Sequence, residues 1–200
     1  LQFMHLAADI HNQIGDVEGN AVLSTAFEEQ TPHFPVLFGD YVYGKLLKLL
    51  CEIDCYEWVE ELAKIICTMN EGAIIRQEVL EVNQRDLEAA LIVLEKEYGA
   101  LFDEAGRTGV ILAGGTAAEA KQLGQFGGLI GMLIGANELQ LDPQISESLR
   151  REAQRTLNFL PEGWLRDAAQ ELLREIGASI AEISSLSRMA QEPRLAACSA

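Results

Sequence analysis

The sequence predicts an all-α protein in which antiparallel helices pack as one bundle. Apolar residues recur at three- and four-residue spacing along most of the chain, and helix start signals stand where these patterns begin. The alternating patterns of strands are absent. The chain of 200 residues is long enough to bury a sizeable core, and it contains no repeat or low-complexity linker. We therefore expect a single domain over residues 1–200.

The N-terminal third is expected to hold two helices joined by an irregular segment. A first helix is predicted over residues 1–14 and a second over residues 38–50. Residues 15–35 between them are rich in glycine and polar side chains, as is typical of a loop.

The central part carries two apolar helical faces. From Asp86 onward one face is expected to be buried at Leu87, Leu91, Leu94, Tyr98, Leu101 and Ala105. A second face is formed by Leu123, Phe126, Ile130 and Ile134. Thr116, followed three residues later by Glu119, matches a capping box and predicts where the second helix begins.

Two further helices are expected at the C-terminal end. Asp142 followed by Pro143 predicts a helix start, because an acidic N-cap satisfies an amide and proline needs no hydrogen bond in the first turn. The buried face of that helix is expected at Leu149, Ala153, Leu157 and Leu160. After a break at residues 161–163, the last helix is expected to bury Leu165, Ala169, Leu172, Ile176, Ile180 and Ile183.

Charge and hydropathy exclude several classes of function. Lys and Arg number 15 against 31 Asp and Glu, a net charge of −16, which argues against a surface that tracks nucleic-acid phosphates. No apolar run approaches the roughly 18 residues of a membrane span. We expect no nucleic-acid partner, no transmembrane segment and a cytoplasmic location.

The four cysteines, at positions 51, 55, 67 and 198, do not have the spacing of a zinc site. We expect buried, reduced thiols instead.

The order of four segments resembles the trans-prenyltransferase (polyprenyl diphosphate synthase) family. These segments are residues 5–11, 38–43, 69–72 and 124–131. The resemblance implies an isoprenoid-synthase-type helical bundle, here with part of the family's length missing. It also implies two Asp-Asp-x-x-Asp clusters on facing helices, whose carboxylates hold Mg²⁺ against a substrate diphosphate. On this basis residues 1–35 form the first Asp-rich helix and its loop, 36–141 the central helices and 142–200 the C-terminal helices.

Both clusters depart from the family pattern. The first has become degenerate at Asn12 and Gln13, which leaves Asp16 as its carboxylate. The second aligns with residues 138–142, where Glu138 and Asp142 remain and Leu139 is apolar. Six expected carboxylates become three, so we expect no resident metal, with Asp16, Glu138 and Asp142 as weak candidate ligands.

The cations that would grip diphosphate are missing as well. Residues 21–35 contain no Lys or Arg where the family has an Arg pair, and Glu97 aligns with a family lysine. A segment with a Lys-Asp pair that normally follows the second cluster is also missing. An acidic chain without these cations would repel a diphosphate, so the sequence predicts a catalytically silent protein and no confident catalytic residue.

Each remaining candidate also has a structural interpretation. Asp16 and Asp142 are either vestigial ligands or helix caps, with capping favoured for Asp142, and Glu138 is the best surviving ligand. Ala7 and Ala8 lie where the family lines its elongation cavity, although helix packing explains small residues equally well.

The preferred hypothesis is a non-catalytic subunit, regulatory or chain-length-setting, of a heteromeric polyprenyl diphosphate synthase in isoprenoid biosynthesis. Its partner would be a catalytic synthase subunit, or a second copy in a homodimer, docked on residues 39–62 or 86–112. One alternative is a divergent active prenyltransferase that uses Mg²⁺ to condense isopentenyl diphosphate with an allylic diphosphate. The other is a hydrophobic-ligand-binding or scaffold protein.

Overall fold

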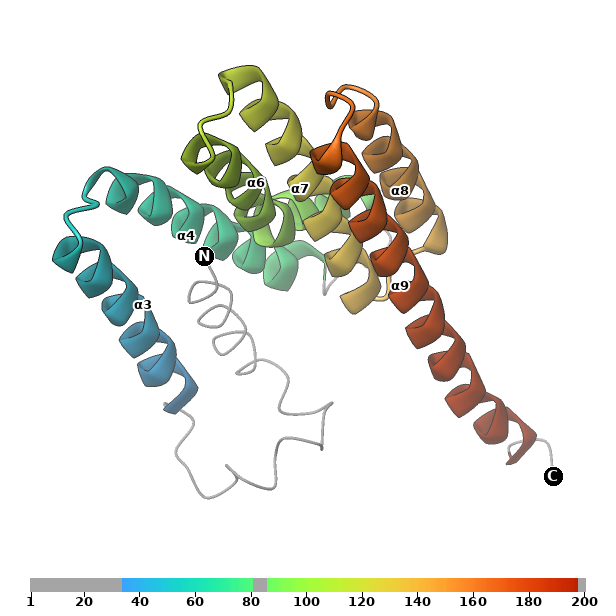
Figure 1. Ribbon diagram of the computed structural model, residues 1–200. Helices are drawn as coiled ribbons and strands as arrows, with labels where there is room; N and C mark the ends of the chain where they lie inside the picture. The colour runs from blue at the N-terminus through green and yellow to red at the C-terminus, as the bar shows by residue number, and fades with distance from the viewer. Residues whose placement is uncertain (1–33, 81–85, 198–200) are drawn as a thin grey trace. The chain divides into compact units, whose positions relative to one another are not determined.

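The computed structural model describes residues 34–80 and 86–197, and these ranges consist of helices and the turns between them (Figure 1). The predicted all-α class is therefore confirmed for the described part of the chain. The chain divides into two compact units, residues 1–67 and 68–200. The expected single domain and its three regions stay predictions, and the helix expected over residues 1–14 lies outside the described residues.

The first unit contains α3 (Phe34–Glu52) and most of α4 (Glu57–Ile75). Helix α3 includes the predicted helix over residues 38–50. Each helix buries a short apolar stripe, and these stripes comprise Val42 and Leu46 on α3 and Leu62 and Ile65 on α4. The turn between the helices places Asp54 in the left-handed region, with φ 55°.

The prediction of buried thiols is wrong for the first unit. Cys51 and Cys67 are exposed, and Cys55 is half-buried. The physical reason is helical phase, because Cys51 and Cys67 do not lie on the three- and four-residue steps that continue the buried stripes of their helices. Cys198 lies outside the described residues.

The second unit runs from the end of α4 through seven further helical segments. These are η1 (Arg76–Leu80), α5 (Leu87–Val93), η2 (Leu94–Gly99), α6 (Ala100–Leu112), α7 (Ala117–Glu138), α8 (Pro143–Leu157) and α9 (Trp164–Ala197). Helix α7 contacts α6 and η2 along one side and α8 and α9 along the other (Figure 1). The main core forms around α7 and contains Leu94, Phe126, Ile130, Leu133, Ala136, Leu149, Ala153, Leu157, Leu160, Ala169 and Leu173.

The predicted starts of α7 and α8 are confirmed. The Thr116 hydroxyl accepts a hydrogen bond from the Glu119 backbone amide, and the Glu119 carboxylate accepts one from the Thr116 amide at 2.8 Å. Asp142 caps α8 by accepting from the Gln144 amide at 2.8 Å. The stop after α8 is held by Arg166, whose Nε donates to the Leu160 carbonyl at 2.8 Å.

The apolar face predicted from Asp86 onward is wrong in its first half. Leu94 and Leu101 are buried as expected, but Leu87 and Leu91 are 55% and 39% exposed, and the buried side chains there are Ala89, Ala90 and Val93. The cause is η2, a π-helical segment whose wider turn accommodates about one extra residue. Upstream of that turn, the buried face is therefore displaced by one position.

One position of the buried face predicted for the last helix is wrong, and the side chain of Ile183 lies outside the described residues. Leu172 is 43% exposed, and its neighbour Leu173 is buried against the core. Two adjacent helical residues point about 100° apart, so only one of them faces α7 and α8. Helix α9 begins at Trp164, and Ala169 is buried on the face that packs against the core. Leu173 follows Ala169 by four residues and therefore lies on the same face.

Helices α6 and α7 approach so closely that glycine is required between them. A Cβ added at Gly127 would overlap the carbonyl oxygen of Phe102, and one at Gly131 would overlap the carbonyl oxygen of Tyr98. At Gly135 an added Cβ would meet the Tyr98 ring itself. The glycines of α7 thus fix the position of η2 and of Tyr98 against it.

Candidate functional site

A cavity of about 970 Å³ lies within the second unit, between η1, α5, the turn from α7 to α8, and α8 itself. Its wall includes Glu138, Leu139 and Asp142, the three positions of the degenerate second cluster. The remaining lining residues are Arg76, Leu87, Ala90, Leu91, Gln140, Leu141, Gln144, Ile145, Ser148 and Leu149.

Glu138 is the last residue of α7 and is exposed at the cavity. Its carboxylate accepts a hydrogen bond from the Tyr98 hydroxyl. Burial raises the pKa of Tyr98 well above its ordinary value, and the charges of Glu97 and Glu138 raise it further. Tyr98 therefore stays a neutral donor that holds Glu138 in place.

Leu139 and Asp142 both serve the local structure. Leu139 caps the end of α7 and packs, half-buried, against the small cluster of Ala90 and Val93. The Asp142 carboxylate is the N-cap of α8. Of the second-cluster positions, Leu139 therefore packs against other apolar side chains, and Asp142 accepts a hydrogen bond at the start of α8.

The two carboxylates that remain at the second-cluster positions both take part in hydrogen bonds. Mg²⁺ prefers hard oxygen ligands in near-octahedral geometry. Here Glu138 accepts a hydrogen bond from the Tyr98 hydroxyl, and Asp142 accepts one from the Gln144 amide as the N-cap of α8. Within residues 34–80 and 86–197, no group of three His, Cys, Asp or Glu side chains is placed to hold a metal ion. The first-cluster positions Asn12, Gln13 and Asp16, and the cavity candidates Ala7 and Ala8, lie outside the described residues.

An ion pair between Arg76 and Glu97 lies beside this cavity. The Arg76 Nε donates to the two Glu97 carboxylate oxygens at 3.0 and 3.3 Å, and the Glu97 side chain is only 4% exposed. Glu97 stands where the resemblance implies a lysine that grips phosphate. The second unit therefore neutralises this acid internally with a cation from the neighbouring helical segment.

Gly72 makes this ion pair possible. A Cβ at position 72 would lie 2.6 Å from the Glu97 backbone nitrogen, so glycine allows α4 to approach η2. Outside this contact, Lys96 pairs with Glu71 at 2.8 Å. Sequence reasoning missed the burial of Glu97, although a glycine and an arginine one helical turn apart could have pointed to a close contact with an acid.

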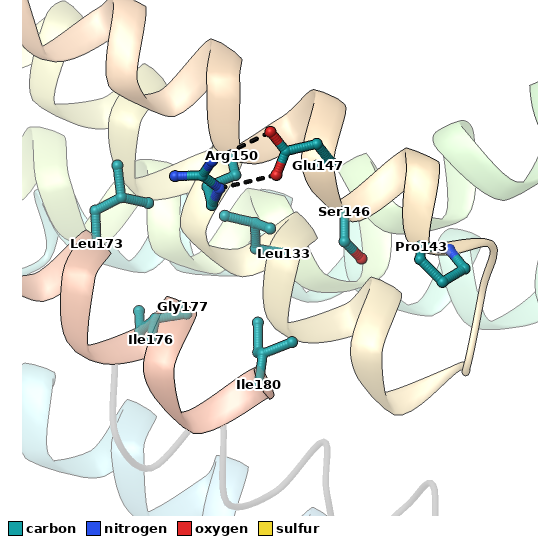
Figure 2. Close-up of a pocket in the computed structure, with 9 residues that line it drawn as sticks. All are labelled: Leu133, Pro143, Ser146, Glu147, Arg150, Leu173, Ile176, Gly177 and Ile180. Carbon is teal, nitrogen blue, oxygen red and sulfur yellow. Dashed lines mark hydrogen bonds and ion pairs between the residues drawn. The ribbon is translucent and has the colours of Figure 1, made fainter. Parts of the chain in front are cut away.

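A smaller groove of about 220 Å³ lies between α7, α8 and α9. Figure 2 shows Leu133 of α7 and Ile176 and Ile180 of α9 gathered along it, with the Glu147–Arg150 ion pair nearby. The charged side chains that line this groove, Glu147 and Arg150, form an ion pair, and most of the other lining residues are apolar. We therefore do not consider this groove a candidate catalytic site.

The helical arrangement is that of the isoprenoid synthase fold. The structure aligns with a deletion mutant of heterotetrameric geranyl pyrophosphate synthase from mint, solved in complex with ligands, with a TM-score of 0.66 and 21% identity. That alignment covers 86% of this chain and 72% of the mint chain. A geranyltranstransferase from Methanosarcina mazei aligns with a TM-score of 0.62 and 19% identity over 90% of this chain and 74% of that one. The predicted isoprenoid-synthase bundle is thereby confirmed.

The amino-acid sequence is also similar to curated polyprenyl diphosphate synthases. The chain is 26% identical over 137 residues to octaprenyl diphosphate synthases of Haemophilus influenzae and Escherichia coli. The match covers 66% of this chain but 40% and 41% of those enzymes, so the chain is similar to less than half of their length. No protein-family model matches the chain. Among the helices described, none has an apolar stretch long enough to span a bilayer.

Proposed function

We propose that this protein is a non-catalytic subunit of a heteromeric polyprenyl diphosphate synthase, in which it regulates a catalytic partner or sets product length. The observation that carries the proposal is the Arg76–Glu97 ion pair. An acid occupies the position of a phosphate-gripping lysine, and its buried charge is already matched by an arginine. A diphosphate at this position would meet a carboxylate instead of a cation.

Three further findings support the same role. The second cluster retains two acids, each engaged in a structural hydrogen bond. The sequence is similar to octaprenyl diphosphate synthases over part of their length. The mint protein with the same fold is described as heterotetrameric, so this fold occurs in a heteromeric synthase.

The test is co-expression with catalytic synthases encoded in the same genome, followed by assays of each protein alone and of the mixture. Farnesyl diphosphate, isopentenyl diphosphate and Mg²⁺ are supplied, and both rate and product length are measured. We expect the isolated chain to form no product and the mixture to differ from the partner alone. Full activity of the isolated chain would contradict the proposal, as would a mixture identical to the partner alone.

Substitutions separate the proposed subunit from a divergent enzyme. If the isolated chain turns over substrate through Glu138 and Asp142, Glu138→Gln and Asp142→Asn abolish that turnover. Glu152→Gln is the matched control, because Glu152 lies on α8 outside the cavity lining and carries the same charge. Activity lost in the first two variants and retained in the control would establish the enzyme alternative.

A further inference from the structure

Three large apolar side chains in two turns of the second unit are mostly exposed. Leu112 at the end of α6 is 74% exposed, and Phe159 and Trp164, which flank the turn between α8 and α9, are 69% and 78% exposed. No other large apolar side chain described in this unit is more than 55% exposed. These three side chains therefore gain the most free energy when another molecule removes them from water.

The two turns lie at the same end of the second unit. Helices α6 to α9 follow one another through short turns and run in alternating directions, so the end of α6 and the end of α8 point the same way (Figure 1). Ile111, next to Leu112, adds a further exposed apolar side chain at this end. None of these side chains lines either of the two cavities described above. They form an apolar end that projects from the helices, and such a group of exposed side chains marks an interaction surface.

This end of the second unit is almost uncharged, although the chain carries a net charge of −16. Residues 109–118 contain no charged side chain, and all of them except Val110 are exposed. In the other turn, residues 158–165 contain one charged side chain, Glu162, which pairs with Arg166 at 3.7 Å. Moving this end into a medium of low dielectric constant therefore avoids most of the cost of burying charges.

The backbone amides of both turns already have acceptors inside the protein. The amides of residues 113–116 donate to acceptors within residues 109–119. In the other turn, the amides of residues 158–160 donate to the carbonyl oxygens of residues 155–157, and the Arg166 guanidinium donates to two carbonyl oxygens of the turn. The apolar part of a lipid bilayer offers the backbone no hydrogen-bond partner, so a turn enters it at low cost only when its polar groups are satisfied internally. Both turns largely meet this requirement.

We propose that the apolar end formed by Ile111, Leu112, Phe159 and Trp164 binds the surface of a neutral, zwitterionic lipid bilayer. Large apolar and aromatic side chains, tryptophan among them, partition into the interface between headgroups and acyl chains. A bilayer needs no pocket of matching shape, which suits side chains that project from two turns. Anionic lipid is disfavoured because it repels an acidic protein. This inference goes beyond the proposed subunit role and does not depend on it.

Trp164 can report its own contact with lipid. Trp58→Phe leaves Trp164 as the single tryptophan of the full chain, and this variant is titrated with phosphatidylcholine vesicles. We expect a saturable shift of the emission maximum to shorter wavelength, and quenching when the lipid acyl chains are brominated. Co-sedimentation of the unsubstituted chain with the same vesicles should give the same affinity. A chain that neither sediments with the vesicles nor shifts its emission overturns the proposal, as does tighter binding when phosphatidylserine is added to the vesicles.

Two variants locate the binding surface. Leu112→Ser and Phe159→Ser each remove a mostly exposed side chain, so they should leave the fold intact. Each should weaken co-sedimentation with phosphatidylcholine vesicles about ten-fold, because one large apolar side chain no longer leaves water on binding. Ile74→Ser is the matched control, since Ile74 is 53% exposed on α4 and should not affect binding. Equal weakening in the control would reduce the effect to overall hydrophobicity and refute the site, as would unchanged binding in both turn variants.

A failure of this proposal is distinguishable from a failure of the subunit role. The vesicle experiments use the isolated chain without a synthase or substrate, whereas the subunit role is tested by the activity of the mixture. A negative result in either experiment therefore leaves the other unchanged.

Discussion

Replacing Gly131 with alanine tests whether the approach of α7 to η2 and α6 is as close as the structure indicates. The new Cβ would overlap the Tyr98 carbonyl oxygen and lie 2.9 Å from Cδ2 of Phe102. Overpacking of this kind costs about 1–3 kcal/mol of stability. We expect about 2–3 kcal/mol here, because a backbone carbonyl cannot rotate away from the new methyl group. Alanine recovers about 1 kcal/mol of helix propensity. The net loss is therefore about 1–2 kcal/mol.

Urea unfolding followed by circular dichroism at 222 nm measures this loss. With a slope of about 2 kcal/mol per molar urea, the midpoint should fall by roughly 0.5–1 M. Gly109→Ala on α6 is the matched control, since nothing lies within 4 Å of a Cβ at that position. The control should raise the midpoint by about 0.5 M, because only the propensity gain of about 1 kcal/mol applies. A rise in both variants would refute the close approach of the helices.

Three further predictions concern charge and hydrogen bonding in the second unit. Arg76→Met should cost about 3–5 kcal/mol in urea unfolding because it removes the arginine of this ion pair from the buried Glu97 carboxylate, and adding Glu97→Met should recover most of this loss. Because the pKa of Tyr98 is raised in the folded protein, its contribution to stability is present below pH 10 and lost above it. Between pH 9 and pH 11 the melting temperature of wild type should therefore fall more than that of Tyr98→Phe, and equal falls would count against the burial of this hydroxyl. Thr116→Ala should cost about 1 kcal/mol at pH 7. Hydrogen bonds from Thr116 lower the pKa of Glu119, so this difference should shrink as the pH falls below 4.5, which urea midpoints at pH 7 and pH 3 would show.

Local rules predicted the helix boundaries well because each boundary depends on a few neighbouring residues. The Thr116 capping box and the Asp142–Pro143 start are both present in the structure. The face of α8 is buried at the predicted positions for the same reason, since a straight α-helix of 15 residues keeps its phase. Short-range chemistry alone was sufficient for these elements.

The π-helical segment η2 could not be predicted by the same rules. A 3.6-residue repeat assumes a uniform helix, and one wide turn displaces every position upstream of it. This error hid the burial of Glu97 and its pairing with Arg76, which depends on tertiary contact between η1 and η2. The exposure of Leu87 and Leu91 at the cavity was missed for the same reason, since the uniform repeat assigned both side chains to the core.

The resemblance to the prenyltransferase family led to the positions of the candidate site, and the structure then showed the hydrogen-bond partners of Glu138 and Asp142. The alignment of the second cluster with residues 138–142 led to the cavity, whose wall contains those positions. The sequence could not give the partner of Glu138, because Tyr98 is 40 positions away along the chain and meets it through the packing of η2 on α7. Nor could composition indicate that Asp142 and Arg76 are engaged within the protein.

The wide turn in η2 also makes the composition of the cavity wall sensitive to the length of the chain. Deleting one residue from this segment would restore a regular helix and rotate α5 by about 100° relative to α6. Leu87 and Leu91 would then turn inward, and smaller side chains would replace them along the opening. Loss of a single residue here would thus change which side chains of α5 line the cavity without substituting any of them.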